Sequence, residues 1–261
     1  MNAESFYGSR MYKAQVEVIL EMGSCTLLPD DIVTVTVSLY NYARYLRECL
    51  DSIHAQTHLP LELIIVDDSS SADNSLIVAE NWLRANGNRF VHALLLKHRR
   101  NQGLAVSRNT AFSHACSDAV FVIDADNAIY PRAISRLYET FQETGGGAVY
   151  SQLEFFGNER RLGHADVWSA ERLKTGNYID AMALVSKLAW TKVGGYSDNS
   201  GMEDYDFWCK FIEMGIKAIY VPEILCRYRV HSTSMLRTET HPLTKEIFIR
   251  MSFRHPWLEL P

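Results

Sequence analysis

Apolar segments of strand length alternate with segments of helical periodicity from residue 32 onward, and this alternation restricts the chain to one class of fold. Ile32–Leu39 (IVTVTVSL) is rich in β-branched residues, which favour strands. Ala43–Gln56 follows, with Leu46, Leu50 and Ile53 spaced along one helical face. Strand–helix alternation of this kind predicts a parallel sheet with right-handed crossovers. We therefore expect an α/β fold.

The same alternation continues to a fourth strand. We expect strands at Leu61–Val66, Phe90–Leu96 and Ala119–Ile123, and helices at Asn74–Ala85 and Gly103–Ala115 with Asn101 as a cap. Beyond a helix at Pro131–Phe141 the pattern loosens after three glycines, Gly145–Gly147, which indicates a smaller mixed part. There we expect strands at Ala148–Phe155, Tyr178–Val185, Ile216–Val221 and Leu225–Val230, and a helix at Glu203–Met214 with Phe207, Phe211 and Met214 on its inner face.

The 261 residues suffice for one large domain with short extensions. We expect an N-terminal extension over residues 1–30, with a short helix at Tyr12–Met22, one domain over residues 31–234 and a C-terminal tail over residues 235–261. The formal charge of −5, from 26 basic and 31 acidic residues, does not support a nucleic-acid partner.

Cysteine usage and hydropathy indicate the compartment. The cysteines are scattered, odd in number and without a CxxC pair, which argues against a disulfide framework and against a zinc site; they are Cys25, Cys49, Cys116, Cys209 and Cys226. No secretory signal pattern and no apolar run of membrane-spanning length is present in the sequence. We expect a cytoplasmic protein with no transmembrane segment, and peripheral association with the inner face of a membrane stays open.

Two carboxylates, Asp124 and Asp126, close the apolar run Ala119–Ile123. In an open α/β sheet ligands bind beyond the carboxyl ends of the strands, and residues i and i+2 of a strand share a face. Paired carboxylates there suit Mg²⁺ or Mn²⁺ carried in with substrate phosphates. A surface Asp-x-Asp turn is the alternative interpretation.

Two further acidic pairs stand at predicted element ends. Asp67 and Asp68 follow a strand, where they are either site residues or turn residues. Glu203 and Asp204 open a helix, where they either interact with its dipole or include a general base.

Two basic side chains complete the candidate set. Arg108 lies in the third helix and is either a bidentate phosphate ligand or an exposed helical arginine. His231 follows a strand and is either part of a metal site or a surface imidazole.

Taken together, the motifs resemble the family 2 glycosyltransferases with the GT-A fold. The likeness covers roughly residues 32–234 and rests on four ordered segments and a weaker fifth: Val35–Asn41 (VTVSLYN) with Tyr45–Leu46 and Cys49–Leu50, Leu63–Ser70 (LIIVDDSS), Asn101–Asn109 (NQGLAVSRN), Phe121–Asn127 (FVIDADN), and Val193–Tyr196 (VGGY) followed by Glu203 and Asp204. The ordered set is far more specific than any one segment.

The resemblance implies a nucleotide-diphospho-sugar transferase fold and an inverting enzyme that moves a sugar from a nucleotide donor to an acceptor hydroxyl, assisted by Mn²⁺ or Mg²⁺. It implies nucleotide-sugar binding by Ser38, Tyr40, Asp68, Arg108 and Asp124, a metal site at Asp126 and His231, and a catalytic base at Asp204 with Glu203 beside it. The acceptor, a glycan, a lipid-linked sugar or a protein, is not indicated, since residues 152–174 carry no recognisable motif.

Two departures from the family pattern and four other interpretations accompany this prediction. Asn127 stands where the family often has an acid, and Leu39 where many members have proline. A haloacid-dehalogenase-type phosphatase also begins from Asp-x-Asp, although Ala128 stands where it usually has threonine. Sugar nucleotidyltransferases and dinucleotide-binding dehydrogenases need a glycine-rich loop after the first strand, where none occurs. A non-catalytic nucleotide-sugar-binding module is the last alternative.

Overall fold

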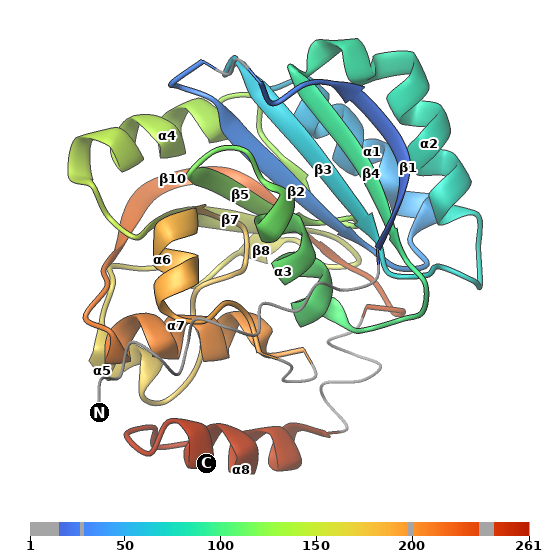
Figure 1. The fold of residues 1–261 in the computed structure, drawn as a ribbon. Coiled ribbons are helices and arrows are strands. Elements are labelled where there is room, and N and C mark those ends of the chain that lie inside the picture. The colour runs from blue at the N-terminus through green and yellow to red at the C-terminus, as the bar shows by residue number, and fades with distance from the viewer. Residues whose placement is uncertain (1–15, 27–28, 198–200, 235–242, 261) are drawn as a thin grey trace, which may run out of the picture.

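The computed structural model describes residues 16–26, 29–197, 201–234 and 243–260. Within them, a ten-stranded sheet runs through the molecule in the order β1-β4-β3-β2-β5-β9-β7-β10-β6, with β8 paired to β7 (Figure 1). Its parallel half consists of β2 (Val33–Leu39), β3 (Leu61–Asp67), β4 (His92–His98) and β5 (Ala119–Asp124). The predicted α/β fold with a mostly parallel central part is confirmed.

Helices cover both faces of this sheet. They are α1 (Ala43–His54), α2 (Ser75–Asn86), a 3₁₀ turn (Gly87–Arg89), α3 (Leu104–His114), α4 (Ala133–Thr144), α5 (Ala170–Leu173), α6 (Lys187–Lys192), α7 (Glu203–Glu213) and α8 (Thr244–Arg254). Helices α1, α2 and α4 contribute to one buried cluster, and α3, α6, α7 and α8 contribute to the other. Within β3, Leu63 and Ile65 belong to the first cluster and Ile64 and Val66 to the second, because successive strand residues face opposite sides.

The C-terminal half of the sheet is mixed. Strand β9 (Ala183–Ser186) is antiparallel to both β5 and β7 (Ala148–Gly157), and β10 (Ala218–Val230) is parallel to β7. Two short strands, β6 (Ala128–Ile129) and β8 (Arg161–Leu162), are antiparallel to β10 and β7. This arrangement confirms the smaller mixed part that the sequence predicted.

Two strand predictions in this half were wrong in extent. The strand expected at Tyr178–Val185 is reduced to β9, since residues 178–182 are irregular. The two strands expected between Ile216 and Val230 are one strand, whose register against β7 shifts between Val221 and Cys226. Pro222, which cannot donate to a strand ladder, lies in this irregular stretch.

The N-terminal segment was also predicted wrongly. Residues 16–23 form strand β1 (Val16–Gly23), antiparallel to β4 at the sheet edge, and not a helix; residues 12–15 lie outside the described part. Met214, expected on the inner face of α7, is exposed because the helix ends one residue before it. The domain boundaries at residues 30 and 234 stay a prediction.

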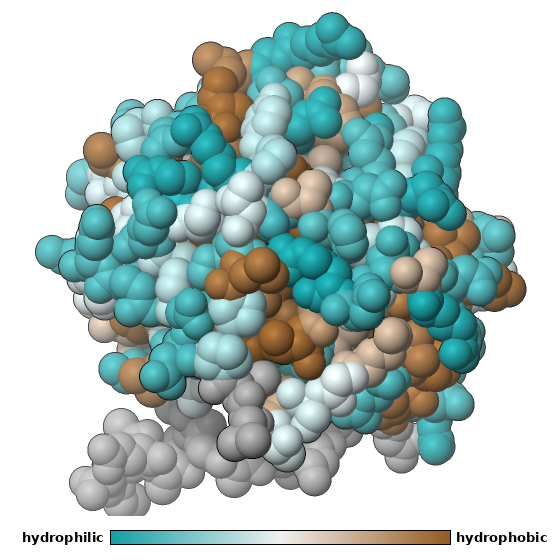
Figure 2. Space-filling model, turned by 90° about the horizontal axis from the view of Figure 1, so that it is seen from above, coloured by the Kyte–Doolittle hydropathy of each residue, from teal (hydrophilic) through white to brown (hydrophobic). Residues whose placement is uncertain are grey.

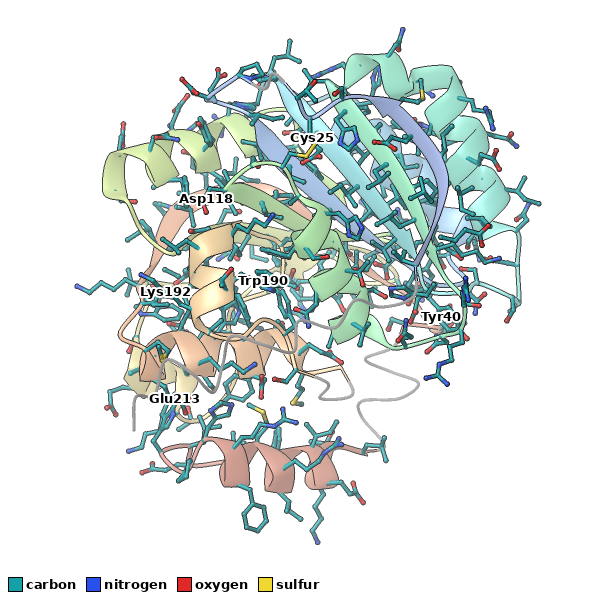
Figure 3. The ribbon with its side chains drawn as sticks, in the orientation of Figure 1. Cys25, Tyr40, Asp118, Trp190, Lys192 and Glu213 are labelled. Atoms are coloured by element: carbon teal, nitrogen blue, oxygen red, sulfur yellow. A yellow bond between two sulfur atoms is a disulfide. The ribbon has the colours of Figure 1, made fainter. Side chains whose placement is uncertain are left out.

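The two ends of the sheet differ in character. Tyr40, which follows β2, and Cys25, which follows β1, lie at opposite ends of the parallel strands (Figure 3). The view from above shows the end near Cys25 as mostly hydrophilic, with hydrophobic residues in small separate groups (Figure 2). No helix of the described residues is both long and apolar enough to span a bilayer.

Candidate functional site

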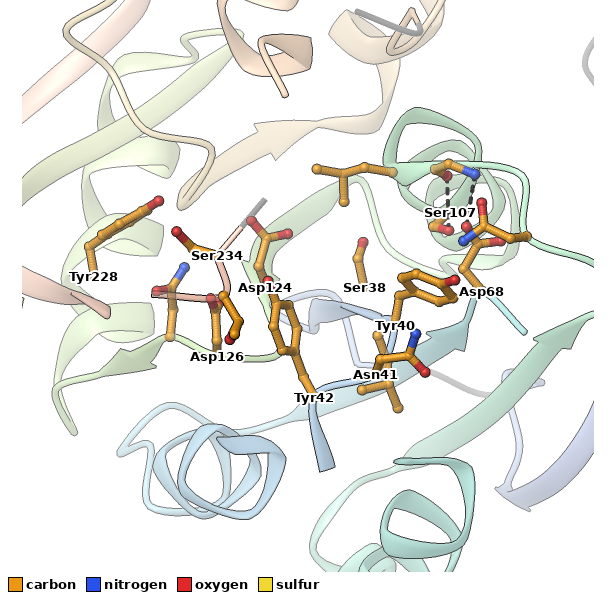
Figure 4. A pocket seen from close by; sticks show the side chains of 16 residues that line it. Ser38, Tyr40, Asn41, Tyr42, Asp68, Ser107, Asp124, Asp126, Tyr228 and Ser234 are labelled. Atoms are coloured by element: carbon orange, nitrogen blue, oxygen red, sulfur yellow. Dashed lines mark hydrogen bonds between the residues drawn. The ribbon is translucent and has the colours of Figure 1, made fainter. Parts of the chain in front are cut away.

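A cavity of about 530 Å³ opens at the carboxyl ends of β2, β3 and β5, a size within the usual range for ligand sites. Asp124 and Asp126 lie toward one side of it, and Tyr40 and Asp68 toward the other (Figure 4). The lining residues are Ser38, Leu39, Tyr40, Asn41, Tyr42, Asp68, Asn101, Gly103, Leu104, Ser107, Asp124, Asp126, Asn127, Tyr228, Thr233 and Ser234.

Arg108 fixes Asp124 from behind the cavity. Its Nη2 donates to Asp124 Oδ2 at 3.0 Å and to Oδ1 at 3.1 Å. Burial lowers the pKa of Arg108, but the carboxylate of Asp124 outweighs it, so the net shift of this pKa is upward and the guanidinium stays charged. Arg108 is 3% exposed and its guanidinium carbon lies 5.3 Å from the centre of the Tyr196 ring. The alternative reading of Arg108 as an exposed helical arginine is therefore wrong.

Asp126 is held by the C-terminal part of the fold. Strand β5 ends at Asp124, so Asp126 lies in the turn that follows and is not on the strand itself. His231 Nε2 is 2.9 Å from Asp126 Oδ2, and Arg229 Nε donates to the Asp126 carbonyl at 2.7 Å. Burial raises the pKa of Asp126, and the charge of Asp124 raises it further. His231 is 5% exposed, so it is not a surface imidazole.

Asp68 organises the loop ahead of α3. Its Oδ1 is 2.6 Å from His98 Nδ1 and accepts from the Gln102 amide at 2.9 Å, and its Oδ2 accepts from the Gly103 amide at 2.8 Å. These amides lie directly ahead of α3, whose N-cap is Gly103 and which has no side-chain cap, so the cap expected at Asn101 is not found. Asp68 borders the cavity with a carboxylate that is already largely hydrogen-bonded.

The loop after β2 is tied to the loop after β3. Asn41, with a positive φ of 56°, accepts hydrogen bonds at its side-chain oxygen from the amides of Ser71 and Ala72. Tyr40 beside it is exposed, with 42% of its surface accessible. Tyr40 and the half-buried Ser38 therefore present polar groups and a ring to whatever enters the cavity.

Glu203 and Asp204 occupy the first turn of α7, outside the cavity lining. Asp204 Oδ2 accepts from Asn177 Nδ2 at 3.0 Å, and Glu203 Oε1 accepts from the Gly201 amide at 3.0 Å. Burial raises the pKa of both carboxyls, and the charge of Arg108 opposes that rise.

Asp206, two residues after Asp204 in α7, has a different electrostatic environment. Its carboxylate contacts Lys210 at 3.0 Å, Arg254 at 2.6 Å and His255 at 3.2 Å. Although burial alone raises the pKa of Asp206, these partners hold it well below its usual range. Asp206 is thus a structural anion, whereas Asp204 is the half-buried acid near Arg108 and Asp124.

The sequence reasoning missed Asp180, which precedes β9. Its Oδ1 accepts from the Met182 amide at 2.9 Å. Burial and the nearby charge of Asp204 raise the pKa of Asp180 to about 7. No motif marks this residue, because it stands in an irregular segment. The position of such a segment is set by tertiary contacts and not by a local sequence pattern. The lining residues Thr233 and Ser234 also follow a strand in an irregular segment, whereas Tyr228 lies within β10; no motif marked any of the three.

The acids of this region suit a divalent cation. Asp126 is 8% exposed and borders the cavity, with a second carboxylate, Asp124, acting on it electrostatically. Buried like charges are unfavourable unless a cation intervenes. A carboxylate with an adjacent imidazole, Asp126 and His231, forms a donor pair that a hard or borderline divalent ion accepts. The residues present therefore fit the predicted Mn²⁺ or Mg²⁺.

The predicted site residues gather in one region of the molecule, but only some of them line the cavity. Ser38, Tyr40, Asp68, Asp124 and Asp126 line the cavity. Arg108 and His231 contact Asp124 and Asp126 without appearing in the lining. Glu203 and Asp204 act electrostatically on Arg108 from α7.

Comparison with known proteins gives one family. The model of glycosyl transferase family 2 matches residues 34–203. The glycosyltransferase GlyA of Streptococcus pneumoniae is 33% identical over 255 residues, which cover 87% of this chain and 35% of GlyA.

Two solved structures share the fold. The Staphylococcus aureus TarS fragment 1–349 in complex with UDP-GlcNAc superposes with a TM-score of 0.68 at 15% identity, over 84% of this chain and 66% of that one. The Pyrobaculum calidifontis mannosyltransferase PcManGT, in complex with GDP-Man and Mn²⁺, gives 0.62 at 22% identity, over 82% of this chain and 61% of that one. The chain spans less than two thirds of each of these three proteins.

Proposed function

Since the chain belongs to glycosyl transferase family 2 and is therefore a glycosyltransferase, we propose that it moves a sugar from a nucleoside diphosphate donor to an acceptor hydroxyl, with inversion at the anomeric carbon. The observation that carries this proposal is the cavity at the carboxyl ends of the parallel strands, with two carboxylates on one side and hydrogen-bonding groups on the other. Donor complexes of TarS with UDP-GlcNAc and of PcManGT with GDP-Man support a nucleotide-sugar donor for this chain.

The nucleoside is assigned to the side of the cavity near Asp68. Ser38 and Tyr40 offer a hydroxyl and an exposed aromatic ring there, which suit a ribose and a base. Asp68, already bonded to the Gln102 and Gly103 amides, sets the shape of this subsite. The diphosphate then lies toward Asp124 and Asp126.

A divalent ion belongs at Asp126 and His231, with Asp124 beside them. When bound, it offsets the negative charge that develops on the departing nucleoside diphosphate, an effect worth several kcal/mol. Arg108 orients Asp124 through its hydrogen bonds at 3.0 and 3.1 Å. The Mn²⁺ in the PcManGT structure supports such an ion here.

Asp204 is the proposed base. As the acceptor oxygen forms its bond to the anomeric carbon and the bond to the diphosphate breaks, the acceptor proton passes to the Asp204 carboxylate. Attack from the face opposite the leaving group inverts the configuration. Burial raises the pKa of Asp204, which makes it a better proton acceptor than an exposed aspartate. Asn177 orients one oxygen of this carboxylate at 3.0 Å.

A thermal-shift screen tests the donor assignment. Purified protein is heated with UDP-, GDP- and dTDP-sugars, each with and without Mn²⁺. We expect one nucleotide class to raise the melting temperature, and only when Mn²⁺ is present. No stabilisation by any nucleotide-sugar at millimolar concentration would refute the proposal.

A further inference from the structure

A second cluster of chemically active side chains lies at the other end of the sheet. Cys25, Glu62, His92 and Cys116 each offer one ligand atom, and these atoms all lie within 4.8 Å of one another. Cys25 follows β1, Glu62 and His92 stand near the starts of β3 and β4, and Cys116 precedes β5. Tyr40, at the mouth of the donor cavity, lies at the opposite end from Cys25 (Figure 3).

The sheet itself aligns these residues. Glu62 pairs with His92 in the parallel register of β3 and β4, and Gly23 pairs with His92 in the antiparallel register of β1 and β4. The chain leaves β1 through Gly23, whose φ of +79° suits glycine, and the Ser24 amide donates to the Val91 carbonyl. Cys25 is thereby placed 3.2 Å from His92 Nδ1 and 3.5 Å from Glu62 Oε1.

The structure joins the Cys25 and Cys116 sulfurs in a disulfide, contrary to the expectation from the scattered cysteines. The two residues are 91 positions apart, so no local spacing of cysteines indicates that they pair. Beside the two sulfurs lie a buried carboxylate, Glu62, and a buried imidazole, His92, whose Oε1 and Nδ1 are 2.7 Å apart.

The hydrogen bonds of Glu62 fix its carboxylate with one oxygen toward the cluster. It is fully buried, and its Oε2 accepts hydrogen bonds from the Thr34 hydroxyl and, at 2.8 Å, from the Cys116 amide. Its Oε1 is left toward the cluster, 2.7 Å from His92 Nδ1. A buried carboxylate needs a cationic or hydrogen-bonding partner on that oxygen.

His92 has the arrangement of a metal-bound histidine. Its Nδ1 faces the cluster, and its Nε2 lies 3.2 Å from the carboxylate of Glu21 on β1. A ligating histidine usually donates its other ring N–H to a carboxylate, which fixes the tautomer and leaves the inner nitrogen free to bind. Glu21 supplies that outer carboxylate.

We propose that Cys25, Glu62, His92 and Cys116 bind one zinc ion when the two cysteines are reduced. Two sulfurs with one nitrogen and one oxygen form a donor set that zinc takes in tetrahedral geometry. Bond lengths of about 2.0 to 2.3 Å place such donors roughly 3.3 to 3.8 Å apart. The Cys25 distances of 3.2 and 3.5 Å are of that order. Metal binding requires the two sulfurs to separate on reduction and the 2.7 Å contact between Glu62 Oε1 and His92 Nδ1 to lengthen.

All four ligand positions are filled by protein, so the zinc is structural. It holds β1 and the α3–β5 loop to the starts of β3 and β4. This site is separate from the Mn²⁺ or Mg²⁺ site of the donor cavity, and the inference does not depend on the proposed transferase mechanism.

Zinc content of the reduced full chain tests the proposal. A phosphine reductant cleaves the disulfide: two thiols form, and the phosphine becomes its oxide with oxygen from one water molecule. Zinc binding then releases the two thiol protons. The protein is incubated with zinc chloride, separated from free metal by gel filtration and analysed by plasma mass spectrometry. We expect one zinc per chain and a higher melting temperature than for the metal-free reduced protein.

Variants locate the ion. Bound zinc should be lost in Cys25→Ser and in His92→Gln, and retained in Cys226→Ala, which removes a buried cysteine elsewhere, and in Asp126→Asn, which alters the donor cavity. Cobalt titration of the wild-type chain gives a second readout, since thiolate ligation produces an intense charge-transfer band that needs no variant to fold. Absence of zinc and of that band in the reduced wild-type chain would overturn the proposal, as would zinc retained in both ligand variants.

Discussion

At the scale of single residues, environment separates acids that the sequence makes look alike. Asp204 and Asp206 stand in the same helical turn, yet Asp206 is surrounded by Lys210, Arg254 and His255. Asp204 instead accepts hydrogen bonds from the Asn177 side chain and the Tyr205 amide, and the charge of Arg108 acts on it electrostatically. This difference supports the proposal that Asp204, and not Asp206, takes the acceptor proton.

The variant Asp204→Asn tests that role. Asparagine preserves the shape and the acceptor for the Tyr205 amide but cannot take the proton. We expect turnover to fall by about 10²–10⁴-fold, the usual contribution of general base catalysis, with donor affinity unchanged. Steady-state kinetics and donor titration measure both quantities.

Glu246→Gln is the matched control, since Glu246 is an exposed acid in the first turn of α8. It should leave both quantities unchanged. Wild-type turnover in Asp204→Asn would remove Asp204 from the mechanism.

Asp180 predicts a dependence of stability on pH. Its pKa is raised to about 7, against about 3.9 for an unperturbed aspartate, so the folded state holds the proton more tightly than the unfolded state. Its contribution to stability therefore falls as pH rises from about 4 to about 7. Asp180→Asn should reduce this fall, giving a melting temperature above that of the wild type at pH 8 and closer to it at pH 4. If the melting temperatures of the two proteins differ by the same amount at every pH across that range, the prediction is contradicted.

At the scale of elements, regular patterns were predictable and irregular ones were not. The β-branched run of β2 and the Leu46, Leu50 and Ile53 face of α1 each agree with the structure, because a buried strand or helix face imposes its own periodicity. Strand β1 was misread as a helix, although its sequence, VEVILEMG, begins with a strand-like alternation. Its identity depends on pairing with β4, whose residues lie 69 to 82 positions further along the chain.

At the scale of elements, substitution of Gly103 tests whether the backbone at the start of α3 shapes the proposed donor site. It stands at the start of α3 with φ +90° and ψ 164°, a conformation nearly restricted to glycine, and its amide donates to Asp68. Gly103→Ala should cost about 1–3 kcal/mol of unfolding free energy and weaken donor binding. Denaturant titration and calorimetry measure the two effects.

Gly176→Ala is the matched control, because a methyl group at either glycine meets open space and Gly176 does not have a positive φ. The control should stay within about 0.5 kcal/mol of the wild type. Equal costs at both positions would show that backbone conformation at Gly103 is not the cause.

At the scale of the whole molecule, the sheet separates two kinds of chemistry. The carboxyl ends of β2, β3 and β5 carry the acidic cavity, and the amino ends of β3 and β4 carry the cysteine cluster. The first could be predicted from sequence, since Asp67–Asp68 and Asp124–Asp126 directly follow apolar runs. The second could not, because its members come from four separate segments whose meeting is fixed by strand order.

The outer contacts of the cavity were equally hidden from the sequence. The contact of His231 with Asp126 joins residues 105 apart, and that of Arg108 with Asp124 crosses from a helix to a strand. Their positions in a helix and after a strand made Arg108 and His231 candidates, but the alternation of strands and helices did not indicate which acid each of them contacts.

The central claim, a cation-dependent nucleotide-sugar site at Asp126, is tested most directly by calorimetric titration of the nucleoside diphosphate selected in the donor screen. Titration is made into wild type and Asp126→Asn, each with and without Mn²⁺. The account predicts that Mn²⁺ strengthens binding to the wild type at least tenfold, about 1.4 kcal/mol, and has no such effect on Asp126→Asn. Equal affinity in all four titrations would contradict it.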